Sequence, residues 1–191
     1  MRKLIKSLLV LTLCFITTGS LSMADAKTNT VKVKMSTNKG DITLELNKEK
    51  APVTVENFLS YVEKGHYNGT IFHRVIPDFM AQGGGFDSNM QEKHTDAPIK
   101  NEALNGLKNQ KWSISMARTM DLDSATSQFF INAKDNDFLD YPTNGGYAVF
   151  GKVVDGFEVV ESIMKVKTTS HLPHDDVPVE PIIIAKAEVI S

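Results

Sequence analysis

The sequence predicts a mainly β protein: a closed or nearly closed antiparallel barrel with two α-helices. Three observations favour this fold. Short apolar runs alternate with clusters of Gly, Asn and Asp, two segments carry apolar residues at helical spacing, and strand patterns at both ends of the folded region could pair to close the sheet. The chain has 191 residues, 41% of them hydrophobic and 23% charged, which suits one globular domain with a substantial core.

The N-terminus has the pattern of a secretory signal peptide and is set apart from the fold. Arg2, Lys3 and Lys6 precede the apolar run SLLVLTLCFITTGS, and small residues follow in SMADA. A basic start, a short apolar run and a small-residue cleavage site are typical of signals that are removed on export. We expect three parts: a signal peptide over 1–24, a short tail over 25–30 and a folded domain over 31–190.

Two alternatives to a cleaved signal are disfavoured. A membrane anchor is disfavoured because the apolar run is short for a membrane span and no later segment is apolar enough to assist it. A lipoprotein anchored through Cys14 is disfavoured because the bulky Leu13 stands where a small residue is needed. Cleavage after Ala24 or Ala26 would place the mature protein in the periplasm, with no membrane association after the signal is removed.

Charge and cysteine usage exclude several function classes. The formal net charge is −2, and loss of the basic signal makes the mature chain more acidic, which argues against general nucleic-acid binding. The single cysteine leaves with the signal. The mature protein therefore has no thiol for disulfides or for redox catalysis.

The folded region begins with a predicted hairpin and a helix. Residues 31–37 and 41–46 both alternate apolar and polar residues, and the turn sequence NKG joins them, which indicates two antiparallel strands. The next segment, 51–65, has apolar residues at helical spacing, Pro52 near its start and Gly65 after its end.

Shorter elements complete the barrel. A second helix is predicted over 155–166, and a strand over 179–190 closes the chain. Between the helices lie five short apolar runs, over 70–76, 79–82, 112–117, 128–132 and 147–154. The polar stretch 86–110 lacks a clear period, and loops of that length are usually functional or flexible.

The segment TIFHRVIPDFMAQGGG contains an arginine among apolar residues. On a regular strand Arg74 would share a face with Phe72 and Ile76. The adjacent His73 would point to the opposite face, and a lone strand histidine is more often structural than catalytic. A hydrolase is disfavoured because the chain has no G-x-S-x-G motif and no mature cysteine.

The segment HLPHDD, residues 171–176, admits two interpretations. His171, His174 and the two aspartates are possible zinc or copper ligands. A solvated loop between the last helix and the last strand is favoured, because no further ligands stand at a clear paired spacing.

Three segments together predict an apolar pocket with a cation and two amides at its rim. They are TIFHRVIPDFMAQGGG, SMARTMDLDSATSQFFI and FLDYPTNGGYAVFG. The alternative is an ordinary barrel core whose arginine is paired with a carboxylate, because buried charges are normally paired. The residues alone leave these two interpretations open.

The stretches FHRVIPDFMAQGGG, SMARTMDLDSATSQFFI and YAVFGKVVDG resemble the cyclophilin family of peptidyl-prolyl cis–trans isomerases. The likeness extends over residues 31–190 and, with the signal, points to the exported bacterial branch. It implies a closed eight-stranded antiparallel barrel capped by two helices. It also implies an isomerase that needs no metal or cofactor, works as a monomer on proline-containing segments of exported proteins and assists their folding. The second hypothesis is a proline-binding chaperone or adaptor module with incidental turnover.

The resemblance also implies roles for individual residues. The catalytic arginine corresponds to Arg74, with Gln82 beside it to orient the guanidinium. The substrate-binding positions comprise the proline pocket with the position of its histidine, the second rim amide, a stretch that binds substrate backbone and one rim aromatic: Phe79, Met80, Ala117, Arg118, Thr119, Gln128, Phe130, Phe138, Leu139 and Tyr147.

The chain departs from the family pattern at four positions. Tyr147 replaces the pocket histidine. Phe138 replaces the rim tryptophan, so weak binding of cyclosporin A is expected. Gly85 stands where many relatives have Asp. Trp112 stands at a strand start where relatives usually carry glycine, and the sequence does not indicate what it packs against.

Overall fold

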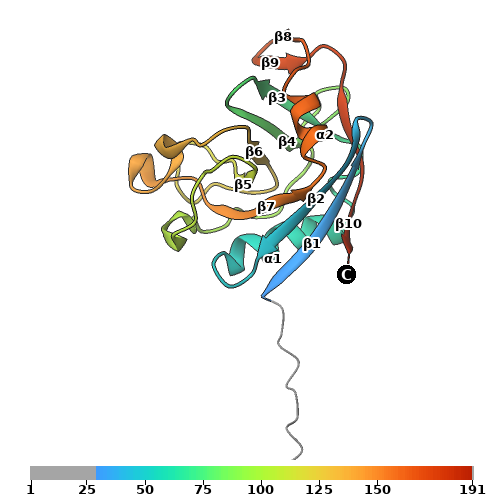
Figure 1. The fold of residues 1–191 in the computed structure, drawn as a ribbon. Coiled ribbons are helices and arrows are strands. Elements are labelled where there is room, and N and C mark those ends of the chain that lie inside the picture. Colours follow the sequence, from blue (N-terminus) through green and yellow to red (C-terminus); the bar gives the residue numbers. More distant parts are fainter. Residues whose placement is uncertain (1–28, 191) are drawn as a thin grey trace, which may run out of the picture.

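The computed structural model describes residues 29–190, so the predicted signal peptide over 1–24 lies outside the described residues. Eight strands form a closed barrel in the order β1-β10-β3-β4-β6-β5-β7-β2, and every neighbouring pair is antiparallel. The predicted barrel is confirmed (Figure 1). Its strands are β1 (Thr30–Thr37), β2 (Gly40–Asn47), β3 (Thr70–Ile76), β4 (Met80–Asp87), β5 (Ser113–Met116), β6 (Phe129–Asn132), β7 (Val149–Asp155) and β10 (Ile182–Ile190).

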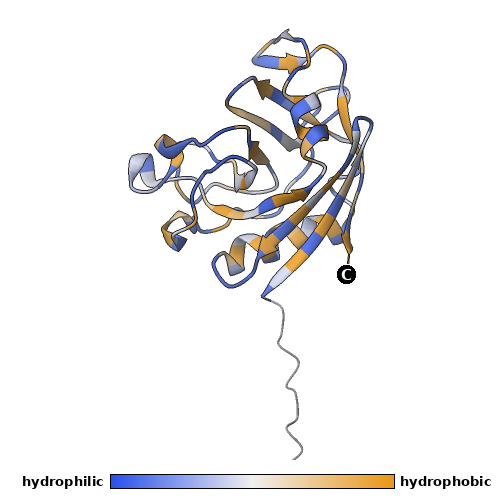
Figure 2. Ribbon diagram, in the orientation of Figure 1, coloured by the Kyte–Doolittle hydropathy of each residue, from blue (hydrophilic) through white to orange (hydrophobic). Residues whose placement is uncertain are grey.

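The first and last strands close the barrel, as their sequence patterns predict. Val33 of β1 is in register with Leu44 of β2 on one side and with Val189 of β10 on the other. The alternation in β1 and β2 is visible as alternating colours in Figure 2. Val33 and Met35 are fully buried, while Lys32, which directly precedes Val33, is exposed. Strand β1 thus turns one row of its side chains into the core.

Both predicted helices are present. Helix α1 (Pro52–Glu63) begins at Pro52 and buries Phe58 against the core. Helix α2 (Phe157–Ile163) is shorter than the predicted 155–166, because β7 continues to Asp155 and Gly156 turns the chain with a φ of 80°. A side chain at Gly156 would approach the carbonyl oxygen of Asp41 to 2.2 Å, so only glycine fits there. No helix within the described part of the chain is long and apolar enough to cross a membrane.

The segment HLPHDD belongs to a hairpin, and the prediction of a simple loop is wrong. Strands β8 (Thr168–His171) and β9 (His174–Pro178) pair with each other outside the barrel and lie next to β3 at its upper end in Figure 1. All six residues of HLPHDD are exposed or half-buried, so the segment has no apolar row to indicate strands. The strand predicted from 179 begins at Ile182, after Pro181, which has no N–H to donate to a sheet.

Trp112 has the left-handed backbone conformation that normally requires glycine, with a φ of 72°. A bulky residue with positive φ is strained by about 1–3 kcal/mol. Its N–H donates to the carbonyl of Asn132 at 2.8 Å, and its own carbonyl accepts from Val153 at 2.8 Å, so strands β6 and β7 hold it. The indole packs against Phe157 with ring centroids 5.5 Å apart, and the ammonium of Lys111 lies 4.3 Å above its ring.

Candidate active site

A β-bulge places Arg74 at the surface of the barrel. Phe72 of β3 pairs with Gly83, and Arg74 pairs with Gln82, so two residues of β3 oppose one residue of β4. A bulge reverses the alternation of faces. Phe72 is buried in the barrel interior, whereas 44% of the Arg74 side chain is exposed. The expectation that Arg74 shares the face of Phe72 is therefore wrong. The side chain of Arg74 lies on the outer face of the barrel, as does that of Ile76.

His73 is the extra residue of the bulge and is buried under the β8–β9 hairpin. Its ring lies 4.6 Å from Phe86 and 6.4 Å from His174, measured between centroids. Burial, and secondarily the nearby His174 and Arg74, lowers the pKa of His73 from 6.5 to about 4. The ring is neutral at pH 7, and its Nδ1 has no hydrogen-bond partner within residues 29–190. These surroundings fit the structural role expected for this histidine.

The apolar floor of the site is a small cluster separate from the main core. Met80 of β4, Phe130 of β6 and Leu139 are buried against one another, with exposed fractions of 3%, 4% and 9%. Leu139 comes from the 3₁₀ turn η2 (Asp137–Leu139). Phe79 and Tyr147 pack on this cluster from its edges. Three segments distant in sequence therefore meet here, as the sequence predicts.

Above this floor opens a cavity of about 250 Å³. Nine of the predicted site residues line it: Arg74, Phe79, Met80, Gln82, Ala117, Arg118, Phe130, Leu139 and Tyr147. The other three, Phe138, Gln128 and Thr119, are not among the lining residues. Phe138 is 55% exposed and stacks on Phe79, with centroids 5.5 Å apart. Gln128 contacts Gln82, and the backbone N–H of Thr119 is already used by the Ser124 hydroxyl at 2.9 Å.

The two rim amides bind each other. Gln82 Nε2 donates to Gln128 Oε1 at 2.9 Å. Gln82 is the cross-strand neighbour of Arg74, as expected for a residue beside the guanidinium, but its N–H is directed to Gln128. The carboxylate nearest to the guanidinium is that of Asp176 on β9, with Oδ2 3.9 Å from Arg74 Nε.

Sequence reasoning missed Asp176. Its segment is remote from Arg74 in the chain, and only the packing of the hairpin against β3 brings the two together.

The geometry of the hairpin also bears on the hypothesis of a metal site in HLPHDD. His171 and His174 are register partners on β8 and β9, but residues 29–190 contain no cluster of three or more His, Cys, Asp or Glu side chains able to hold a metal ion.

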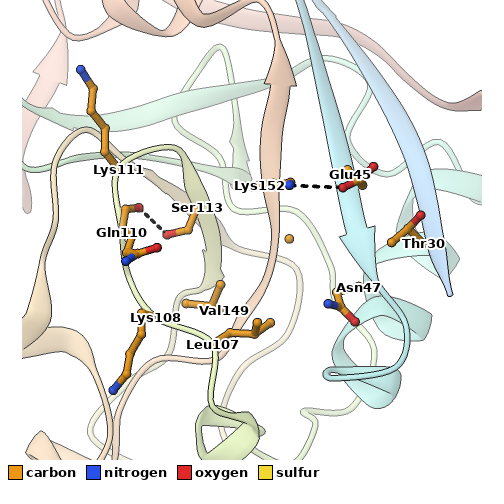
Figure 3. A pocket seen from close by; sticks show the side chains of 11 residues that line it. Thr30, Glu45, Asn47, Leu107, Lys108, Gln110, Lys111, Ser113, Val149 and Lys152 are labelled. Carbon is orange, nitrogen blue, oxygen red and sulfur yellow. Dashed lines mark hydrogen bonds and ion pairs between the residues drawn. The ribbon is translucent and has the colours of Figure 1, made fainter.

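A second cavity, of about 270 Å³, opens beside β2 and β7 and is lined by other residues (Figure 3). Its lysines face carboxylates. Lys152 pairs with Glu45 at 3.5 Å, Lys108 with Asp140 at 3.5 Å and Lys111 with Glu161 at 3.7 Å. The two cavities have similar volumes but differ in the residues that line them. The cavity at Arg74 combines an apolar floor with a guanidinium that is partly exposed and forms only a long ion pair, at 3.9 Å, with Asp176, and it is the better candidate site.

The fold is a closed barrel, and its pocket has the groups to bind a ligand without covalent chemistry. The floor suits a small apolar ring, and the guanidinium and amides at its rim suit the polar atoms of a peptide. Such a site can favour one geometry of a bound group by hydrogen bonding, without forming or breaking a covalent bond.

Comparison with known proteins identifies the family. The model for cyclophilin type peptidyl-prolyl cis-trans isomerase/CLD matches residues 30–189. The chain belongs to the family of cyclophilin-type peptidyl-prolyl cis–trans isomerases and is an enzyme of that class.

Relatives of this class are similar over most of the chain. Peptidyl-prolyl cis-trans isomerase cyp18 of Streptomyces antibioticus is 57% identical over 83% of this chain and 98% of its own length. Peptidyl-prolyl cis-trans isomerase A of Dickeya dadantii is 52% identical over 97% of this chain and 98% of its own. The crystal structure of a cyclophilin-type isomerase of Cryptosporidium parvum superimposes with a TM-score of 0.70 at 29% identity, covering 85% of this chain and 98% of that one.

Proposed function

We propose that this isomerase acts in the periplasm on X-Pro bonds of exported proteins and assists their folding, with the cavity at Arg74 as its active site. The observation that supports the site is the exposed guanidinium at the edge of the floor formed by Met80, Phe130 and Leu139. The N-terminal signal pattern supports the location.

The chemistry of the X-Pro bond explains why this pocket is sufficient. Conjugation between nitrogen and carbonyl opposes rotation by about 18–20 kcal/mol, and uncatalysed exchange takes tens to hundreds of seconds. In the twisted transition state the conjugation is lost, and the prolyl nitrogen becomes a better hydrogen-bond acceptor. A guanidinium N–H from Arg74 then stabilises the twisted state more than either planar state, which accelerates rotation.

The apolar floor has a separate role. Met80, Phe130 and Leu139 hold the pyrrolidine ring while the acyl side rotates. A million-fold acceleration requires about 8 kcal/mol, at 1.36 kcal/mol per tenfold. Oriented hydrogen bonds and ring immobilisation are of that order. A Cryptosporidium parvum relative, 29% identical, has been solved in the presence of the dipeptide Ala-Pro, which supports a proline peptide as the ligand here.

A proline-binding chaperone or adaptor module with incidental turnover is the alternative to folding catalysis. Both functions need the apolar floor, but only catalysis needs a donor aimed at the rotating amide. The exposed side chain of Arg74 therefore favours the enzyme, and its removal separates the two functions.

The test is a protease-coupled isomerisation assay on a short X-Pro peptide. We expect Arg74→Ala to fold normally and to lower kcat/KM at least about a hundredfold, the usual effect of removing one transition-state donor. Arg74→Lys should also be poor, because a point charge does not replace the planar fork. Lys39→Ala, an exposed cation on the β1–β2 turn, is the control. Near-normal turnover by folded Arg74→Ala would refute the proposed role of this site.

The location is tested by fractionating cells and determining the mass of the protein in each fraction. The mature protein should begin at Asp25 or Lys27 and be found in the periplasm. A membrane-bound form that retains residues 1–24 would contradict this proposal and support the anchor interpretation.

A further inference from the structure

Arg118 lines the same cavity as Arg74, but its guanidinium is committed to the protein itself. Nε donates to the carbonyl of Gly146 at 3.1 Å, and Nη2 donates to that carbonyl at 3.0 Å and to Asn144 at 2.6 Å. Nη1 donates to the carbonyl of Thr119 at 2.8 Å. A guanidinium offers five donors in a rigid planar fork. Here that fork gathers three backbone carbonyls instead of extending into the cavity.

Two of these carbonyls belong to a turn that the backbone alone does not favour. Asn144, Gly145 and Gly146 are consecutive residues with φ values of 48°, 77° and 71°. The glycines adopt positive φ readily, but the left-handed conformation of Asn144 is strained and persists only when its surroundings hold it. Asn101 Nδ2 also donates to the carbonyls of Gly145 and Gly146 at 3.2 and 3.1 Å. Arg118 and Asn101 therefore both hold the turn, and they share the carbonyl of Gly146.

The turn leads directly to Tyr147 in the wall of the pocket. The guanidinium carbon of Arg118 lies 4.5 Å from the centroid of the Tyr147 ring, a cation–π contact. The same ring meets Phe130 edge-on, with centroids 5.7 Å apart and planes at 76°. The backbone N–H of Tyr147 donates to the carbonyl of Leu139 at 2.9 Å. A continuous set of contacts thus runs from Arg118 to the floor of the pocket.

We propose that Arg118 is a positioning residue, which fixes the 143–146 turn and Tyr147 and so preforms one apolar wall of the pocket before a proline ring enters. A preformed wall lowers the ordering cost of binding. It contacts the ring equally in the planar and the twisted states, so its loss raises KM and leaves kcat nearly unchanged. The inference rests on the proposed assignment of this cavity as the active site.

Two substitutions of Arg118 separate its charge from its planar fork. Arg118→Met keeps an apolar stem and removes both, and we expect KM to rise roughly tenfold with kcat within about threefold of wild type. Arg118→Lys keeps the charge but not the fork, and KM should rise in the same direction because one ammonium does not hold three carbonyls. Steady-state kinetics in the protease-coupled assay measure both constants.

Asn101→Ala loosens the same turn from outside the cavity and tests whether the effect passes through the turn. We expect a smaller rise in KM, about threefold. Hydrogen exchange gives a readout independent of activity. The N–H of Gly146, bonded to Thr143 at 2.9 Å, and that of Tyr147 should exchange faster in all three variants, while exchange in β1 and β2 stays unchanged. Lys100→Ala, next to Asn101 and exposed, is the matched control and should change neither constant.

Unchanged KM and unchanged exchange in Arg118→Met would overturn the inference. A fall in kcat with unchanged exchange over 143–147 would also overturn it, since Arg118 would then act on the rotating amide itself. If Arg118→Met does not fold, Arg118→Lys and Asn101→Ala decide the question. Full activity of Arg74→Ala would instead refute the proposed site, and the exchange measurements would still report whether Arg118 holds the turn.

Discussion

Gln82 and Gln128 bind each other across the rim of the pocket, with Nε2 of the first 2.9 Å from Oε1 of the second. Gly85 makes this contact possible. A side-chain carbon at Gly85 would lie 2.6 Å from Cγ and Cδ of Gln128, closer than atoms can approach. The glycine, where many relatives are expected to have Asp, therefore leaves the space in which the Gln128 side chain lies.

Gly85→Ala should disturb this pair with little effect on stability. The added methyl meets only a flexible side chain, so Gln128 moves and its hydrogen bond with Gln82 is lost. One neutral hydrogen bond contributes about 0.5–1.5 kcal/mol to stability, so stability falls by no more than that. Because Gln82 is the cross-strand neighbour of Arg74, we expect the loss of its partner to lower kcat/KM roughly two- to tenfold. Gln128→Ala should have a similar effect, and the double variant should show no further loss. Wild-type kcat/KM in Gly85→Ala would show that the pair does not contribute.

Phe129 and Phe130 are neighbours on β6 with opposite roles. Phe129 is fully buried in the barrel core, while Phe130 belongs to the pocket cluster. Phe129→Ala should lower the free energy of unfolding by about 3–5 kcal/mol. Phe130→Ala should cost less stability, because one face of the ring lines an open cavity, but it should raise KM more. Denaturant unfolding and steady-state kinetics on both variants test this contrast; an unchanged KM in Phe130→Ala would assign it to the core.

Cyclosporin A should inhibit this enzyme poorly. In sensitive relatives the rim tryptophan is expected to donate its indole N–H to the drug, and Phe138 has no such donor. A lost hydrogen bond of about 0.5–1.5 kcal/mol, with a desolvated acceptor costing about 1–3 kcal/mol, weakens binding roughly ten- to a thousandfold. Phe138→Trp should bind the drug more tightly, whereas Leu172→Trp at the exposed tip of the β8–β9 hairpin should not. Nanomolar inhibition of the wild type would contradict this prediction.

His73 should make the protein less stable in mild acid. Its pKa lies at about 4 in the folded protein and near 6.5 when exposed, so the unfolded chain takes up a proton first. The stability that depends on a neutral His73 is complete above pH 6.5 and is lost as the pH falls towards 4. It amounts to at most about 3.4 kcal/mol, at 1.36 kcal/mol per pKa unit. His73→Phe should remove this part of the pH dependence. The free energy of unfolding between pH 7 and 4 measures it; identical slopes for the two proteins would exclude the effect.

Local patterns in the sequence determined the barrel strands and both helices, but not the β8–β9 hairpin. The alternation in 31–37 and 41–46, the helical spacing in 51–65 and the two strand-like ends of the chain all reflect the fixed periods of side chains along strands and helices. Those periods are properties of the backbone, so they can be predicted without knowing what the segment packs against. The motifs around Arg74 and Phe130 likewise indicated the residues of the pocket, through their resemblance to a known family.

The tertiary structure determined where those side chains point and which groups they contact. The bulge at His73 moved Arg74 away from the face of Phe72, because a single extra residue reverses the pleat of a strand. The hairpin brought Asp176 to Arg74, and the turn at 143–146 brought two carbonyls to Arg118. Each of these contacts joins segments that are remote in sequence. They depend on strand register and on packing between elements. A one-residue shift of register turns every side chain of a strand to the other face and so changes its contacts.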